Sequence, residues 1–359
     1  MLTKEHERIQ WLDILRGVAI LLVLLFHLTT RFAEKYPMKS FSEPLLFKVG
    51  FGWIGVYLFF MISGFIIYMT IQKKKGPVDF LVARLSRLLP PYWSAILLIV
   101  IFEYLHEALF HIQNRSDWIT TIVNVLMIPD LVHMRFLDGA FWSLFVEVKF
   151  YVLFALLWQL VDMKNNRIYY LSYGFLIMLA GIHNVIRHLP YGDNINYFLI
   201  FWTGIAACKT LYEKMPTWVY LLLTALTTVS TLGLYSNGPE LLIGIPVFSG
   251  LFMISATLFN KYPWAVNFFL PMSRLGRISY SYYLIHQPVG YLILGSAAAL
   301  AMNQYVGIIL AISTCTGVAW LGFTYIEQLN KPIAMFIMNK IESPSGISLQ
   351  DILVWIVSS

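Results

Sequence analysis

The chain has 359 residues, of which 58% are hydrophobic and only 12% are charged. Soluble globular domains carry about 25% charged residues, so this chain lacks the polar surface that a soluble protein of its size requires. The composition predicts an all-α, polytopic integral membrane protein and excludes the fibrous, disordered and disulfide-scaffold classes. The formal charge of +6 indicates no nucleic-acid partner, because the basic residues follow the membrane topology described next.

Ten stretches are predicted to span the bilayer as helices. The first lacks a small-residue cleavage site, and His27 interrupts its apolar run, so we interpret it as a retained helix and not as a signal peptide. The stretch 118–129 is apolar but too short to span, and we expect it at the membrane interface. The predicted spans are 12–32, 50–72, 88–109, 141–161, 168–184, 195–211, 217–235, 239–259, 278–298 and 304–325.

The distribution of basic residues predicts the orientation. An even number of spans puts both termini on one side of the membrane. If that side is the cytoplasm, sixteen lysines and arginines are cytoplasmic and seven lie on the opposite side, as the positive-inside rule requires. The transmembrane domain is expected to cover 1–340, followed by a short tail, 341–359, whose apolar residues are compatible with an interfacial turn.

Ionisable side chains within predicted spans are the first candidates for function, because burying them in a bilayer is costly. Arg16 and His27 are eleven residues apart in the first span, so they share a helical face and lie about 16 Å apart along its axis. Taken singly, Arg16 is explained as an anchor at the inner boundary and His27 as a partner for a neighbouring helix. Imidazole is also the natural general base near neutral pH, and the shared face favours a joint role.

Two further groups are predicted to face the same site. Arg84 and Arg87 are neighbours on one helical face at the inner boundary, where paired guanidiniums suit a phosphate ligand, although topology and anionic lipids explain them equally well. Ser143 and Glu147 share a face at what we expect to be the outer start of a span. Glu147 requires a partner on another helix, and we expect it to orient His27, the alternative being a structural pair.

A polar stripe opens the predicted span 278–298. Spacings of three and four residues place its members on one helical face, which must contact protein or water. Structural and functional interpretations of this stripe are both open. Its members are Ser279, Tyr282, Tyr283 and His286.

With these motifs the chain resembles the bacterial membrane-bound acyltransferase family 3, whose members O-acylate cell-surface polysaccharides, lipopolysaccharide and peptidoglycan. The resemblance covers nearly the whole chain and keeps the motifs in order. It is carried by Arg16-x10-His27, Arg84-x-x-Arg87, Trp142-Ser143-Leu144-x-x-Glu147 and the stretch Ser279–His286, within the phrases Trp11–Gly17, which includes Asp13, and Phe59–Phe65.

The resemblance implies a donor, an acceptor and roles for these residues. The donor is a cytoplasmic acyl-CoA, commonly acetyl-CoA, bound by Arg16, Arg84 and Arg87, and the acceptor is a glycan hydroxyl at or beyond the outer face. His27 is expected to act as general base or transient acyl carrier, supported by Glu147. Supporting or acceptor-side roles are expected for Asp13, Trp142, Ser143, Ser279, Tyr283 and His286. No metal or permanently bound cofactor is expected, and the implied location is the bacterial cytoplasmic membrane.

The chain also departs from the family pattern. Members often carry a Glu-x-Pro sequence after the last span, whereas this chain has Glu327-Gln328-Leu329, so Glu327 is left out of the expected site. Many members continue into a soluble esterase-like domain, for which the residues after the last predicted span are too few. Transfer is therefore expected within the membrane domain or through a polysaccharide-assembly partner.

The rival hypothesis is a transporter or flippase for a lipid-linked glycan or a small solute. Transporters often contain repeated halves with broken helices at matching positions, and no such pairing is found here. The rival is weakened but stays open, because the acyl group itself must cross the membrane.

Overall fold

The structure, a computed structural model, describes residues 9–36, 48–71, 73–110, 116–158, 165–186, 192–231 and 240–342. Every regular element in these ranges is helical, as the composition predicts for a multi-pass membrane protein. The main helices are α1 (Gln10–Phe26), α2 (Phe32–Lys35), α3 (Gly55–Ile71), α4 (Pro77–Phe110), α5 (Trp118–Val125), α6 (Phe141–Leu156), α7 (Asn166–Ile186), α8 (Gly192–Tyr212), α9 (Thr217–Thr231), α10 (Glu240–Lys261), α11 (Leu270–Arg277), α12 (Ser279–Ala299), α13 (Gln304–Tyr325) and α14 (Asn330–Glu342).

Each predicted span coincides with a helix, but the helices differ in their ability to cross a bilayer. Within the described ranges, six helical stretches are long and apolar enough, namely Gln10–Lys35, Gly50–Ile71, Pro77–Tyr104, Asn166–Val185, Leu242–Lys261 and Gln304–Ile341. The helices α6 and α9 are shorter, with 16 and 15 residues. The total of ten spans and the cytoplasmic location of both termini stay predictions, and the tail beyond Glu342 lies outside the described residues.

Helices α8 and α12 lack the hydropathy of a lipid-facing span because they bury polar side chains inside the bundle. Lys209 on α8 was counted above among the cytoplasmic basic residues, yet it is completely buried. Its ammonium group donates to Glu213 (2.7 Å) and to the Tyr68 hydroxyl (3.0 Å) of α3. Buried charges are tolerated where they are paired in this way.

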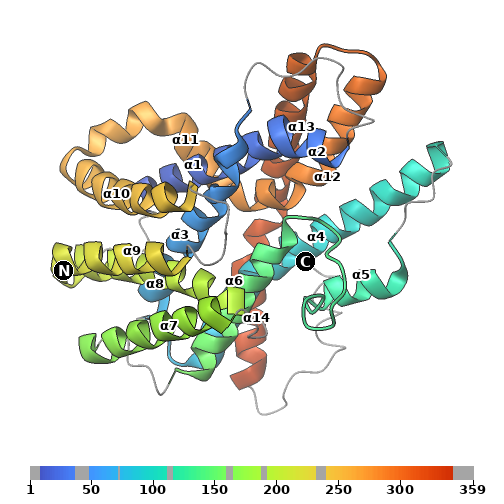
Figure 1. The fold of residues 1–359 in the computed structure, drawn as a ribbon. Helices are drawn as coiled ribbons and strands as arrows, with labels where there is room; N and C mark the ends of the chain where they lie inside the picture. Colours follow the sequence, from blue (N-terminus) through green and yellow to red (C-terminus); the bar gives the residue numbers. More distant parts are fainter. Residues whose placement is uncertain are drawn as a thin grey trace.

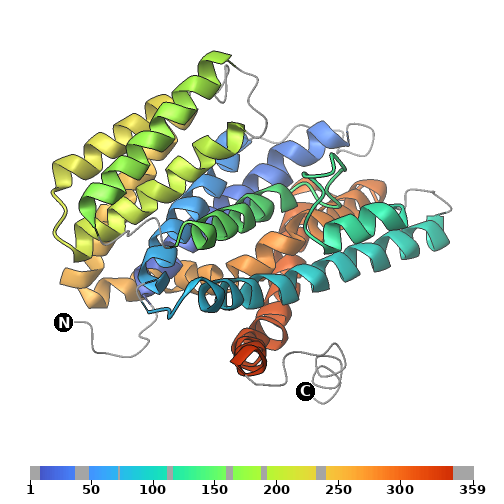
Figure 2. The same cartoon turned by 90° about the horizontal axis from the view of Figure 1, so that it is seen from below.

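Helices α1 and α3 pack against each other near the centre of the bundle (Figure 1). Helix α1 packs against α11, and α3 packs against α8. Gly64 of α3 makes the second contact possible, since a Cβ atom there would lie 2.0 Å from the Phe201 carbonyl oxygen. Small residues allow such close helix contacts in membranes. From below, α7, α8 and α9 lie on one side of this centre and α4 and α5 on the other (Figure 2).

The segment after α4 folds back along it. Ser116 donates through its backbone N–H (3.0 Å) and its hydroxyl (2.9 Å) to Glu103, near the end of α4. The Trp93 indole, much earlier in α4, donates to the Val125 carbonyl (3.0 Å). Helix α5 is therefore antiparallel to α4 and lies along it, and the interfacial position of 118–129 stays a prediction.

Helix α6 consequently begins halfway along α4. The Phe141 ring, at its first residue, lies 4.8 Å from the ring of Tyr92, near the middle of the span Pro77–Tyr104. The Tyr151 ring, in the second half of α6, lies 6.0 Å from the ring of Phe80 near the start of α4. With 16 residues, about 24 Å, α6 covers only part of a bilayer core about 30 Å thick. These contacts place the start of α6 relative to α4, and the start of this helix at the outer face stays a prediction.

Candidate active site

A pocket with about 790 Å³ of empty space, partly open to its surroundings, lies among α1, α3, α4, α6 and α12. It brings together polar residues from every predicted motif, although His27 and His286 themselves do not line it. Its basic and acidic lining is Arg16, Arg84, Arg87 and Glu147, and its hydroxyl-bearing lining is Ser63, Ser143, Tyr151, Ser279, Tyr280 and Tyr283. We call this space the arginine pocket.

Arg84 is built into the wall of the arginine pocket. Its side chain is 6% exposed, and one guanidinium nitrogen donates to the Ile66 carbonyl (3.0 Å) and to the Thr70 hydroxyl (2.5 Å). The guanidinium lies 5.8 Å from the ring centres of both Phe80 and Tyr151. The Nε atom of Arg84 is buried without a hydrogen-bond partner, so this cation retains an unused donor.

The other two arginines line the same pocket. Arg16 forms an ion pair with the buried carboxylate of Asp13 (2.8 Å). Arg87 lines the pocket and makes neither a hydrogen bond nor an ion pair within the described ranges. Guanidiniums bind phosphate oxygens by charge-assisted hydrogen bonds, and three of them line this pocket, so its chemistry suits an anionic group such as a phosphate.

Glu147 belongs to the arginine pocket and does not contact His27. Its carboxylate accepts hydrogen bonds from the hydroxyls of Ser63 (2.7 Å) and Tyr151 (2.6 Å). The predicted Glu147–His27 pair is wrong because α6 starts halfway along α4, which carries Glu147 toward the level of Arg84. Glu147 interacts electrostatically with Arg84 and offsets part of the positive charge.

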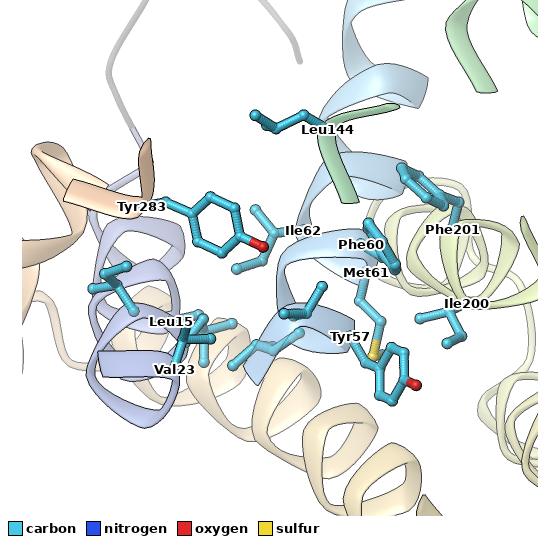
Figure 3. Packing of buried hydrophobic residues seen from close by; sticks show 14 of the residues in the cluster. Leu15, Val23, Tyr57, Phe60, Met61, Ile62, Leu144, Ile200, Phe201 and Tyr283 are labelled. Atoms are coloured by element: carbon cyan, nitrogen blue, oxygen red, sulfur yellow. The ribbon is translucent and has the colours of Figure 1, made fainter. Parts of the chain in front are cut away.

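Two hydroxyls close the end of the arginine pocket that faces His27. The Tyr283 and Ser143 hydroxyls lie 2.7 Å apart, and each is 3.1 Å from the Ala140 carbonyl oxygen. Tyr283 reaches from α12 toward Ile62 of α3, with Leu144 nearby (Figure 3). The Tyr283 ring thus separates the pocket from the histidines beyond it.

His27 is the first residue of a π-helical turn, His27–Arg31, that interrupts the first span. Such turns occur frequently at functional sites. The His27 ring is partly exposed, and its Nδ1 atom lies 2.8 Å from the Tyr291 hydroxyl. The Gln287 amide nitrogen lies 3.4 Å from Nε2. Tyr291 and Gln287 therefore hold the ring in the place predicted for Glu147.

His286 lies between the arginine pocket and His27. Its ring is completely buried, 5.5 Å from the Tyr283 ring and 4.8 Å from the His27 ring, edge to face. Its Nδ1 atom is 2.7 Å from the Tyr283 carbonyl oxygen. Its Nε2 atom is buried without any hydrogen-bond partner.

The turn before α6 covers the other side of His27. Gly139 approaches Gln287 so closely that a Cβ atom on it would lie 3.0 Å from the Gln287 amide oxygen. The preceding Asp138 accepts a hydrogen bond from the Ala140 N–H (2.8 Å), and its burial raises the pKa of this carboxyl to about 6. The Lys35 ammonium lies 5.6 Å from the centre of the Tyr291 ring. Gly139 and Lys35 therefore lie against Gln287 and Tyr291, the two partners of His27.

Most of the predicted residues gather here, but Trp142 does not. Trp142 packs against Tyr197 (5.2 Å between ring centres) and Phe60 (6.1 Å) outside the pocket, as a packing residue. Glu327, left out of the expected site, accepts hydrogen bonds from the N–H and hydroxyl of Ser281 and so caps the start of α12. It fixes the helix that supplies much of the site.

Sequence reasoning missed the partners of His27 and of Glu147. Gln287 and Tyr291 follow Tyr283 at steps of four residues, so the helical period alone places all three on one face of α12. This signal was present in the sequence. Ser63 and Tyr151 gave no comparable signal, because a hydroxyl within an apolar span is common and its partner depends on the tertiary fold.

Comparison with known proteins points to one family. The acyltransferase family 3 profile, described as an acyltransferase domain, matches residues 9–324. OatA of Staphylococcus aureus, an O-acetyltransferase, is 23% identical over 346 residues, which cover 80% of this chain and 53% of OatA. YrhL of Bacillus subtilis, named provisionally as a peptidoglycan O-acetyltransferase, is 27% identical over 209 residues, covering 53% of this chain and 30% of YrhL.

A viral relative is similar over a shorter region. ORF330 of Acidianus two-tailed virus, named provisionally as an acetyltransferase, is 23% identical over 190 residues, or 52% of each chain. The chain thus spans about half or less of the length of these relatives. None of the solved structures matches the chain at a comparable level of significance.

Proposed function

Because the chain belongs to acyltransferase family 3, we propose that it is a membrane O-acyltransferase that moves an acetyl group from acyl-CoA to a glycan hydroxyl. The donor binds from the cytoplasm in the arginine pocket. The acceptor is a cell-surface or exported glycan that approaches His27 from the opposite side, at the bacterial cytoplasmic membrane.

The observation that carries this proposal is the convergence of Arg16, Arg84 and Arg87 on one pocket. Acyl-CoA bears several phosphates at one end and the reactive thioester at the other. Buried or half-buried guanidiniums hold phosphates by bidentate, charge-assisted bonds. With the phosphates there, the pantetheine arm extends past Ser143 and Tyr283 toward the histidines.

His27 is placed to activate the acceptor. Tyr291 holds Nδ1 of the imidazole, so Nε2 faces the acceptor hydroxyl. The acceptor hydroxyl takes the place of the Gln287 amide nitrogen, which lies 3.4 Å from Nε2. As general base, His27 takes the hydroxyl proton while the oxygen attacks the acyl carbon. Over the whole reaction, the carbon–sulfur bond of the donor is replaced by the ester bond, and CoA leaves as the thiol.

The relatives guide the choice of acceptor. The names of OatA and YrhL specify O-acetyl transfer, and that of YrhL specifies peptidoglycan. We therefore propose a cell-wall or surface polysaccharide hydroxyl as the acceptor, with lipopolysaccharide and secreted glycans as further possibilities of the same chemistry. The polar surroundings of His27, including Asp138 and Lys35, suit a hydrophilic acceptor.

A transfer assay tests the proposal. Membranes that contain the chain are incubated with radiolabelled acetyl-CoA, and alkali-labile label is counted in peptidoglycan and surface polysaccharide. Wild type should transfer label, and His27→Ala should not. The matched control is His183→Ala, a histidine of α7 outside the site, which should keep normal transfer. Full transfer by His27→Ala would contradict the role of His27, and glycan transport without acetylation would favour the flippase.

A further inference from the structure

We propose that His286, and not His27, receives the acyl group from the donor thioester before its transfer to the acceptor. This inference rests on the proposed function and specifies its chemical course. It depends on the position of His286, on the protonation of its ring, and on its distance from His27.

The position of His286 is between the two substrates. Tyr283 forms the closed end of the arginine pocket, and its ring is 5.5 Å from the His286 ring. The His27 ring is 4.8 Å away on the other side. A thioester that enters past Tyr283 therefore meets His286 before it meets His27.

The hydrogen bond at Nδ1 fixes the protonation of the His286 ring. A backbone carbonyl only accepts hydrogen bonds, so the 2.7 Å contact with the Tyr283 carbonyl requires that Nδ1 carry the proton. In the neutral ring, Nε2 then carries a lone pair. An imidazole held at Nδ1 by an acceptor has its tautomer fixed and its other nitrogen made more basic.

The lone pair of His286 is unused, whereas both nitrogens of His27 are engaged. Nε2 of His286 is buried without a partner, whereas buried polar atoms in proteins are normally hydrogen-bonded. His27 has Tyr291 at Nδ1 and Gln287 at Nε2. In the structure, the nitrogen ready for nucleophilic attack belongs to His286.

The chemical step balances with these residues and substrates. Nε2 of His286 attacks the thioester carbonyl, the carbon–sulfur bond breaks, and CoA thiolate leaves and takes a proton from water. The acylated ring is cationic, and its Nδ1–H remains bonded to the Tyr283 carbonyl. The acceptor hydroxyl then gives its proton to His27, its oxygen attacks the acyl carbon, and the nitrogen–carbon bond breaks to restore His286. His27 finally releases its proton to the solvent, where it neutralises the hydroxide left when CoA took a proton from water.

An exchange reaction without acceptor tests this course. The full chain in nanodiscs is mixed with acetyl-CoA and radiolabelled CoA, and label entering acetyl-CoA is measured. A relay through His286 predicts exchange, because the first half of the reaction is reversible and needs no glycan. Direct transfer predicts none.

Variants assign the exchange to one histidine. His286→Asn should lose exchange by at least about a hundredfold, since its amide can still donate to the Tyr283 carbonyl but offers no nucleophilic nitrogen. His27→Ala should retain exchange while losing glycan transfer. His183→Ala serves as the matched control and should behave as wild type. Equal acetyl-CoA binding and thermal stability in His286→Asn would exclude misfolding as the cause.

The outcomes separate this inference from the proposed function. If wild type binds acetyl-CoA and acetylates glycan but shows no exchange, the relay is wrong and direct transfer stands. If His286→Asn exchanges at the wild-type rate, His286 has only a structural role. If wild type neither binds acetyl-CoA nor transfers the group, the proposed function itself fails.

Discussion

At the scale of single residues, Tyr291 is the side chain that orients His27. Its hydroxyl lies 2.8 Å from His27 Nδ1, on the ring side opposite the nitrogen that faces the acceptor. An imidazole base whose ring is already held at one nitrogen loses less orientational freedom when its substrate binds. Tyr291 is a positioning residue, because it acts through His27 and does not touch the reacting atoms.

Tyr291→Phe should lower the glycan transfer rate by about tenfold, the equivalent of one hydrogen bond, with acetyl-CoA affinity unchanged. The pH dependence of the rate should also shift, because the hydroxyl stabilises one protonation state of His27. Initial rates across pH and a donor titration measure both effects. Tyr282→Phe is the control: its hydroxyl bonds the Ile312 carbonyl away from the site, so the variant should keep the wild-type pH profile. An unshifted profile for Tyr291→Phe would refute the positioning role.

The protonation state of Asp138, in the turn before α6, affects the stability of the folded protein. Burial raises the pKa of its carboxyl to about 6, so the folded state favours the protonated form. The contribution of the protonated carboxyl to the free energy of unfolding is fully present below the unfolded pKa of about 3.9. It is lost as the pH rises through the folded pKa of about 6, because the buried carboxyl must then ionise.

Asp138→Asn should therefore raise the thermal midpoint at pH 7 and leave it unchanged near pH 4. The amide oxygen can still accept from the Ala140 N–H, so the turn keeps its hydrogen bond. Thermal unfolding in detergent at both pH values measures this difference. A lower midpoint at pH 7 would show that the charged carboxylate is stabilising, contrary to this account.

At the scale of elements, close helix contacts position the pocket walls. The Gly64–Phe201 contact between α3 and α8 leaves no room for a side chain. Gly64→Ala should lower the thermal midpoint by several degrees, because a methyl group there forces the helices apart. Gly174→Ala on α7 is the control, since nothing lies within 4 Å of a Cβ there, and it should be neutral or slightly stabilising. Equal midpoints for the two variants would contradict the packing described for α3 and α8.

The elements also show what the sequence could predict. Arg16 and His27 follow from the period of a single helix, and Arg84 and Arg87 from adjacent positions on another, so local pattern was sufficient for them. The pairing of Glu147 with His27 failed because the depth of α6 depends on how 116–140 folds along α4. That fold rests on tertiary bonds: the Asn124 side chain, for example, donates to the Arg135 carbonyl (3.1 Å) and accepts from the Leu137 N–H (3.1 Å). Periodicity carries no signal for such contacts.

At the scale of the whole molecule, the proposed function requires opposite access for its two substrates. The arginine pocket must open to the cytoplasm and His27 to the outside. The basic residues predict this orientation, and the positions of Arg16 and His27 along one span agree with it.

Single cysteines test the orientation, because the native Cys208 and Cys315 are buried. Lys73→Cys, in the exposed turn before α4, should react with an impermeant maleimide only in inside-out vesicles. Lys48→Cys, exposed just before α3, should react in intact cells. The reverse pattern would place the arginine pocket outside and contradict a cytoplasmic donor.

Calorimetric titration of the purified chain with acetyl-CoA tests the central claim most directly. We expect micromolar binding that weakens at least about tenfold in Arg87→Ala, which loses one charge-assisted bond, and further in the double variant Arg84→Ala with Arg87→Ala. CoA lacking its 3′-phosphate should also bind more weakly. Arg274→Ala, an exposed arginine of α11 outside the pocket, should bind normally. Folded protein that does not bind acetyl-CoA, or binds it equally in all these variants, would contradict the assignment of the arginine pocket to the donor.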